Sequence, residues 1–240
     1  MADYKTLHGS HIEVVASDPS NPVAGQVWYN TSSNVMKGFT SNPAGSWASG
    51  GDLNTARSDL GGAGATKDAA LGFGGSPPPA PTAKAITESY NGSTWTEVAD
   101  FNTARAYCAG AGTYTSAIAS GGDQLSGTSE SWNGTSWTEV GDVNTARGYV
   151  SGDGTSTSGL IYAGVSATPA RVANAESWNG TAWTEVGDLS TARNGGPLGG
   201  AGSGNTNALM FGGTTGSVSV ATEEFTSPTE TTVTFNATDV

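Results

Sequence analysis

The residues of this sequence best suited to chemistry are four arginines that recur along the chain. Each ends an Asn/Ser-Thr-Ala-Arg tetrad, stands ten residues after a tryptophan and five after an aspartate; they are Arg57, Arg105, Arg147 and Arg193. Four guanidinium groups arranged on one ring could bind an anion. A group present once per unit is more typical of architecture, because a catalytic site needs different residues in different roles.

We therefore expect each arginine to make a charge-assisted bond that fixes the loop between neighbouring units. Its partner is either the aspartate five residues upstream or a glutamate of the same unit. The candidate glutamates are Glu88, Glu130, Glu176, and either Glu223 or Glu224.

Other chemistry has little support. His8 and His11 are the only histidines, and two donors do not make a zinc site. Cys108 is the only cysteine, expected as a small buried hydrophobe in a strand. Calcium loops are absent apart from a weak Gly-Asp-Gly at 152–154. The sequence predicts no enzymatic activity, no cofactor and no metal.

The composition predicts an all-β protein. Glycine occurs 36 times, charged residues make up 12% of the chain, and Thr, Val, Trp and Tyr recur in short runs. Such a composition favours many short strands joined by tight turns. The formal net charge of −12 disfavours nucleic acid and anionic membranes as partners. No segment reaches the roughly 18 apolar residues of a membrane span, and residues 1–21 show no export signal.

The elements that must position the arginines form four similar units, with periods of 48, 42 and 46 residues between successive arginines. After the arginine comes a Gly/Ala-rich strand, such as 106–112, and then a small-residue strand that ends at Gly-Gly or Ala-Gly. A variable loop leads to a third strand ending at an aromatic residue. In three units Asn-Gly follows, and a tryptophan stands five residues beyond the aromatic. Asn-Gly predicts a tight hairpin with both turn residues at positive φ, so each unit indicates four antiparallel strands.

Four-stranded sheets repeated radially are blades of a β-propeller, and a linear β-solenoid is the alternative. Closure is favoured because Phe225 has no partner tryptophan, whereas Trp47 stands before the first unit. A strand at 46–48 would complete the last blade and remove both open edges. This divides the chain into an N-terminal arm with a β-hairpin, residues 1–40, and a propeller, residues 41–240. In an alternative, the hairpin at 26–39 contributes to a fifth, partial blade.

The Gly-Gly pair, the later aromatic and the tryptophan five residues beyond it resemble the kelch repeat over residues 47–226. The resemblance implies a kelch-like β-propeller of four blades, fewer than is usual in that family, and leaves function open. Ala163 replaces the first glycine in the third unit, and the fourth unit lacks the paired tryptophan.

The segment before the repeats carries, in order, Ile12 to Val15, Ser17-Asp18-Pro19, Pro22, Gly25 to Asn30 and Lys37-Gly38-Phe39. It resembles the N-terminal segment of virion proteins of tailed phages, especially marine ones, and the repeats are also similar to those of such proteins. The resemblance implies a non-enzymatic structural protein of the virion, a tail fibre, appendage or capsid decoration, assembled in the host cytoplasm and released by lysis. Its partners would be other virion proteins, bound through the arm, further copies of itself, and a glycan or protein of the host surface. The alternative is a bacterial carbohydrate-binding or adhesive module.

Recognition is expected on the loops between the second and third strands, which share a face with the loops between blades. These loops differ most among the units: 76–86, 123–128, 165–173 and 214–220. A rigid scaffold with dissimilar loops on one face commonly carries recognition, although the loops could equally be simple linkers. The candidate receptor contacts are Pro79, Lys84, Gln124, Leu125 and Arg171.

Overall fold

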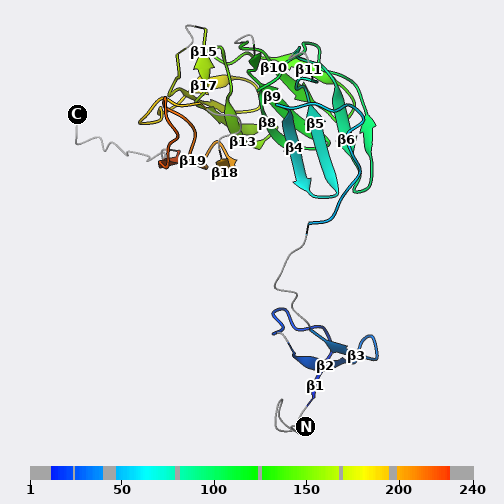
Figure 1. Cartoon of the computed structure of the whole chain (residues 1–240). Helices are drawn as coiled ribbons and strands as arrows, with labels where there is room; N and C mark the ends of the chain where they lie inside the picture. The colour runs from blue at the N-terminus through cyan, green and yellow to red at the C-terminus, as the bar shows by residue number, and fades with distance from the viewer. Residues whose placement is uncertain are drawn as a thin grey trace, which may run out of the picture. The chain divides into compact units, whose positions relative to one another are not determined.

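The computed structural model describes residues 12–23, 25–39, 47–78, 82–123, 126–167, 170–194 and 199–227. Within these ranges the regular structure consists of β-strands (Figure 1). The chain divides into two compact units, Met1–Ser49 and Gly50–Val240. The sequence placed the boundary slightly earlier, after residue 40. His8 and His11 lie outside the described residues.

The first unit is a three-stranded sheet of β1 (Glu13–Val15), β2 (Val27–Asn30) and β3 (Val35–Gly38). β1 runs parallel to β2, and β2 and β3 form the expected hairpin. The Asp18 carboxylate holds the sheet together: it accepts hydrogen bonds from Trp28 Nε1 at 3.0 Å and Asn30 Nδ2 at 2.7 Å, and pairs with Lys37 Nζ at 2.7 Å.

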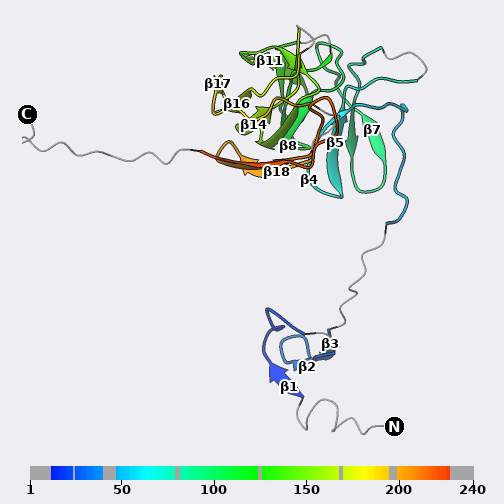
Figure 2. The ribbon, with the colours of Figure 1, turned by 60° about the vertical axis from the view of Figure 1, so that its left-hand side comes forward.

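The second unit contains the four repeats as four antiparallel sheets (Figures 1 and 2). The first is β4 (Gly61–Thr66), β5 (Ala69–Phe73), β6 (Thr87–Tyr90) and β7 (Trp95–Glu97). The second is β8 (Ala109–Thr113), β9 (Ser116–Ser120), β10 (Ser129–Trp132) and β11 (Trp137–Val140). The third is β13 (Ser151–Thr155), β14 (Ser158–Tyr162), β16 (Ala175–Trp178) and β17 (Trp183–Glu185). The fourth has three strands among the described residues: β18 (Gly199–Gly204), β19 (Asn207–Phe211) and β20 (Thr222–Thr226).

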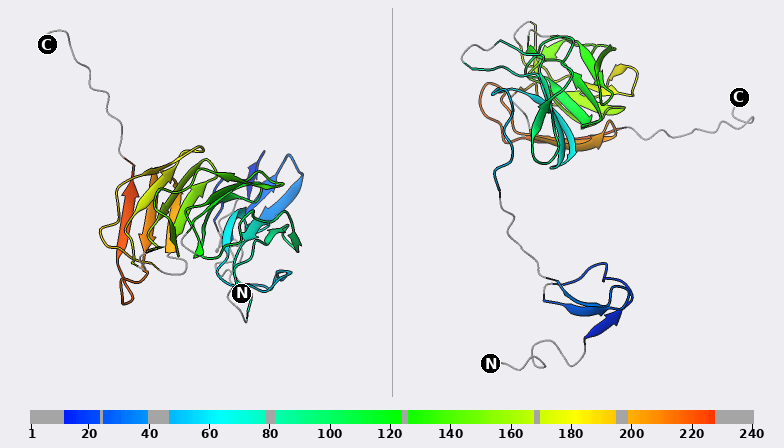
Figure 3. Two further views of the ribbon diagram at one scale, coloured as in Figure 1. Left: turned by 90° about the horizontal axis from the view of Figure 1, so that it is seen from above. Right: turned by 90° about the vertical axis from the view of Figure 1, so that its right-hand side faces the viewer.

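The four-stranded antiparallel repeat is therefore confirmed, and the sheets lie side by side in chain order (Figure 3, left). Their first strands contact one another in the sequence β4, β8, β13, β18. Glycines on these strands allow the close approach: a Cβ built on Gly110 would lie 2.4 Å from the Gly62 carbonyl oxygen. The Gly/Ala composition of this strand is explained by that spacing.

The Asn-Gly hairpins exist, but their turn geometry differs from the expected two-residue form. Cross-strand pairs such as Trp132 with Trp137 leave a four-residue loop, and only its glycine has positive φ, as Gly134 shows at 93°. The asparagine acts through its side chain instead: Asn133 Oδ1 accepts the backbone N–H groups of Thr135 and Ser136, each at 2.9 Å. A side-chain oxygen that closes the loop removes the need for a second positive φ.

Aromatic side chains fill the spaces between neighbouring sheets. Phe73 and Phe101 from the first repeat pack on Trp137 of β11, with ring centroids 5.1 and 4.4 Å away. Trp183 of β17 occupies the same position between the second and third sheets. Trp47, by contrast, lies in a segment with no assigned strand and is fully exposed. The strand expected at 46–48 is thus not seen in the part of it that the structure describes.

Candidate functional site

Each tetrad arginine is buried and forms an ion pair with a glutamate on the third strand of its sheet. The pairs are Arg57–Glu88, Arg105–Glu130, Arg147–Glu176 and Arg193–Glu223. The nitrogen–oxygen distance is 2.6 Å for Arg57 and 2.5 Å for Arg147. We call this arrangement the Arg–Glu clamp. Of the two expected partners, the structure selects the glutamate, with Glu223 over Glu224, and the upstream aspartates form none of the ion pairs to these arginines among the described residues.

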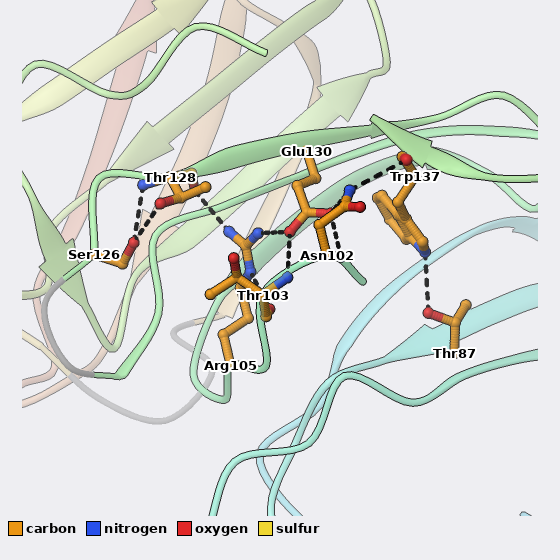
Figure 4. A network of polar contacts seen from close by, with 8 residues as sticks. All are labelled: Thr87, Asn102, Thr103, Arg105, Ser126, Thr128, Glu130 and Trp137. Carbon is orange, nitrogen blue, oxygen red and sulfur yellow. Dashed lines mark hydrogen bonds and ion pairs between the residues drawn. The ribbon is translucent and has the colours of Figure 1, made fainter. Parts of the chain in front are cut away.

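The clamp also holds the backbone of the tetrad, as Figure 4 shows for the second repeat. Glu130 Oε2 accepts the backbone and side-chain N–H groups of Asn102, both at 2.8 Å, and Asn102 Nδ2 reaches the Trp137 carbonyl at 3.2 Å. The first and third repeats repeat this pattern at Asn54 and Asn144. The loop between sheets is thereby fixed to the third and fourth strands of the sheet that follows it.

Glu88 and Glu176 have a lowered pKa in spite of burial. Burial by itself raises the pKa of Glu88, but hydrogen bonds from Asn54 and Arg57 outweigh it, and the net pKa lies below the ordinary value. For Glu176 burial is again the largest single influence, opposed by Arg147 and the Asn144 and Thr145 backbone, and the net pKa is lowered. A carboxylate so completely engaged has a structural role and is unsuited to proton transfer.

Tryptophans connect neighbouring sheets by hydrogen bonds as well as by packing. Trp137 Nε1 donates to Thr87 Oγ1 of the first sheet, and Trp183 Nε1 donates to Ser129 Oγ of the second, both at 3.0 Å. This role of the tryptophans was not predicted from the sequence. The signal was available, because a small hydroxyl residue precedes the clamp glutamate in these two repeats.

The tetrads and the loops between second and third strands lie on one face, as expected. Gly75 N donates to the Arg105 carbonyl at 2.9 Å, and Gly164 N donates to the Arg193 carbonyl at 3.0 Å. The short strands β12 (Arg147–Gly148) and β15 (Val165–Ser166) pair across the same face. We call it the loop face.

Of the five candidate receptor contacts, one is exposed, one is half-buried and three lie outside the described residues. Arg171 is exposed on the loop face, where its Nε donates to Asn194 Oδ1 at 2.8 Å. Lys84 was expected to be exposed but is half-buried, because its backbone bonds to Gly75 and Arg105 draw the loop onto the sheet. Pro79, Gln124 and Leu125 lie outside the described residues.

A stacked tyrosine pair on the loop face was not anticipated. The rings of Tyr107 and Tyr149 are 4.0 Å apart with an interplanar angle of 26°. Each stands two residues after a tetrad arginine at φ 56°, and Asp59 has the corresponding position at φ 60°. Burial, together with a hydrogen bond to Asp59, raises the pKa of Tyr107 to about 12. Half-buried aromatic rings with strained backbones are typical of contact surfaces.

The remaining thiol and carboxylate groups among the described residues do not form a reactive site. Cys108 is buried directly before β8, and burial raises the pKa of its thiol to about 11. Asp153 accepts the Tyr162 hydroxyl at 3.0 Å. In the described ranges, no three His, Cys, Asp or Glu side chains are grouped closely enough to hold a metal ion. Nor does any helix there have the length and apolar character needed to cross a membrane.

Comparison with known proteins returned no relatives: no family model matches the chain, and no curated protein is significantly similar to it.

Proposed function

We propose that this protein is a non-enzymatic structural component of a tailed-phage virion, a tail appendage or capsid decoration. Its repeat unit supplies blades of a kelch-like propeller that displays the loop face to the host surface, and its N-terminal unit attaches to the particle. The resemblance of residues 12–39 to virion proteins motivates this assignment. The physical argument comes from the surfaces of the two units.

The observation that carries the proposal is an uncovered apolar face on the N-terminal sheet. Val14, Tyr29 and Met36 are cross-strand neighbours and therefore lie on one face, opposite the buried Trp28. Val14 is 62% exposed and Met36 55%. Units of this size seldom bury enough surface to be stable alone, and exposed apolar patches mark interaction sites. This face is where we expect another virion protein to bind.

The repeat unit has the features of a rigid scaffold that displays variable loops. The Arg–Glu clamp recurs in all four repeats, whereas the loops it supports differ in length and sequence. Variation confined to loops on one face, over a constant framework, suits recognition of a surface ligand. The acidic charge and the engaged carboxylates favour binding over catalysis.

The attachment role is tested on phage particles that are purified on a density gradient from a lysed culture. The phage in that culture carries the gene for this chain. We expect peptides of this chain in the particles, and their loss when the chain carries Val14→Asp and Met36→Asp. Val218→Asp, at a residue 92% exposed in the other unit, is the matched control and should be retained. Absence of the wild-type chain from the particles would overturn the virion assignment.

The recognition role is tested separately with the purified full chain on a glycan array and on intact bacteria. Lys84→Glu with Arg171→Glu should reduce binding at least tenfold if these loops contact the receptor. Thr135→Glu, on a hairpin turn and exposed, should leave binding unchanged. Glycan binding by a chain that is absent from particles would support the carbohydrate-binding alternative instead.

A further inference from the structure

The last sheet has a pocket on the side that faces the third sheet, lined by apolar side chains together with Asp188, Glu223 and Glu224. Leu160, Tyr162 and Leu189 line it from the third repeat, and Ala208, Met210 and Phe225 line it from the fourth. Every one of these residues has a counterpart around Trp137. The counterparts are Leu71, Phe73, Phe101, Ala117, Ala119 and Trp132, all members of the cluster that buries this tryptophan. The pocket is therefore the tryptophan position of the fourth repeat.

The chain contains one tryptophan with the right context for this position. Residue 230, five beyond Phe225, is glutamate, whereas Trp47 precedes Arg57 by the same ten residues as the other repeat tryptophans. Trp47 is fully exposed. Gly51, four residues later, packs over Ser93 of the first sheet, as Gly141 packs over Thr181 of the third. The chain at Gly51 thus lies against the first sheet as the chain that follows the outer strand of a preceding sheet does.

The two ends of the row of sheets are complementary surfaces. At the far end Phe211 is 43% exposed, while its counterparts Phe73 and Tyr162 are 0% and 2% exposed. Thr222, the counterpart of Thr87, is exposed as well. At the near end Trp95 has the position from which Trp137 and Trp183 donate to a hydroxyl of the preceding sheet. The far end thus has a hydroxyl, on Thr222, and the near end has a tryptophan, Trp95, at the two positions that bond to each other between neighbouring sheets.

Among the described strands, these two ends do not pack against each other. β18 makes no contact with β4 comparable with those that link β4 to β8 or β13 to β18, and the first and last sheets lie at opposite ends of the row (Figure 3, left). The uncovered surface at both ends therefore points to another molecule with the same two surfaces, which is a second copy of this chain.

We propose that two copies associate head to tail, and that residues 47–49 of each copy form the outer strand of the other's last sheet, with Trp47 in its pocket. A two-fold axis makes both contacts equivalent and closes the assembly, since four sheets from each chain give a ring of eight. This differs from closure within one chain, which was the expectation from the sequence.

The register of the proposed strand follows from the other repeats. Trp132 pairs with Trp137 and Ser131 with Thr138, so Phe225 should pair with Trp47 and Glu224 with Ala48. A chain carrying both Ala48→Cys and Glu224→Cys distinguishes the alternatives. After oxidation at micromolar concentration, exchange between copies gives a covalent dimer on a non-reducing gel, whereas closure within one chain gives a cross-linked monomer. Each single variant should give neither product, and Cys108 is buried and does not interfere.

Light scattering on a size-exclusion column provides the second measurement. We expect the wild-type chain at twice its monomer mass, and Trp47→Ala to raise the dimer dissociation constant at least tenfold. Val218→Ala, an equally exposed apolar residue away from the pocket, should leave it unchanged. A monomeric wild-type chain, a cross-linked monomer, or a dimer without the cross-link would overturn the proposal. None of these outcomes bears on whether the protein belongs to a virion.

Discussion

At the scale of single residues, the Arg–Glu clamp is the feature on which the repeat depends. Arg147 and Glu176 have side chains that are 0% and 1% exposed. Removal of one partner from a buried ion pair leaves the other charged and desolvated, which is more costly than the loss of one surface contact.

We expect Arg147→Ala to lower the free energy of unfolding by roughly 3–5 kcal/mol, measured by urea denaturation. Arg171→Ala is the matched control, because the same side chain is removed from an exposed site and should change the free energy by less than about 0.5 kcal/mol. Equal effects of the two substitutions would show that the clamp does not stabilise the fold.

The lowered pKa values of Glu88 and Glu176 predict an acid-sensitive fold. A carboxyl whose pKa is lower in the folded state stabilises the protein above its unfolded pKa, and that contribution disappears as the pH falls through the folded pKa. Stability should therefore be level near neutrality and decrease below about pH 4.5, the ordinary glutamate value. Thermal unfolding between pH 7 and 3 measures this, and Glu176→Gln should reduce the slope below pH 4.5.

At the scale of elements, neighbouring sheets are spaced by the glycines of their first strands. Gly110→Ala should destabilise the protein by roughly 1–3 kcal/mol, because its Cβ would meet the Gly62 carbonyl and force β4 and β8 apart. At Gly187 no atom lies within 4 Å of the added Cβ, and Gly187→Ala should be neutral or slightly stabilising. Chemical denaturation of both variants gives the comparison, and a neutral Gly110→Ala would argue against close strand packing.

At the scale of the whole molecule, acidic residues outnumber basic ones and give the chain a net charge of −12. Self-repulsion of like charges disfavours the compact state, and salt screens exposed charges over about 10 Å at 0.1 M while affecting buried pairs much less. We expect the unfolding temperature to rise between 10 and 200 mM NaCl by scanning calorimetry. A fall over this range would mean that exposed ion pairs, and not the buried clamps, dominate the electrostatic stability.

The sequence by itself determined the repeat, its antiparallel strands and the two candidate partners of each arginine, the upstream aspartate and a glutamate of the same unit. These features are local and periodic: the tetrad, the glycine pairs and the tryptophans recur at fixed spacing, and each repeat confirms the interpretation of the others. The side of the sheet that carries the dissimilar loops followed from the same strand order.

Only the tertiary structure decided what depends on contacts between repeats. The choice of Glu223 over Glu224 rests on which side of β20 faces Arg193, and the turn geometry rests on a hydrogen bond that the Asn133 side chain accepts from the Thr135 backbone. The Tyr107–Tyr149 stack and the pocket beneath Phe225 arise where neighbouring repeats meet. Strand period and composition contain no distance between repeats, so these features could not be derived before the sheets were placed side by side.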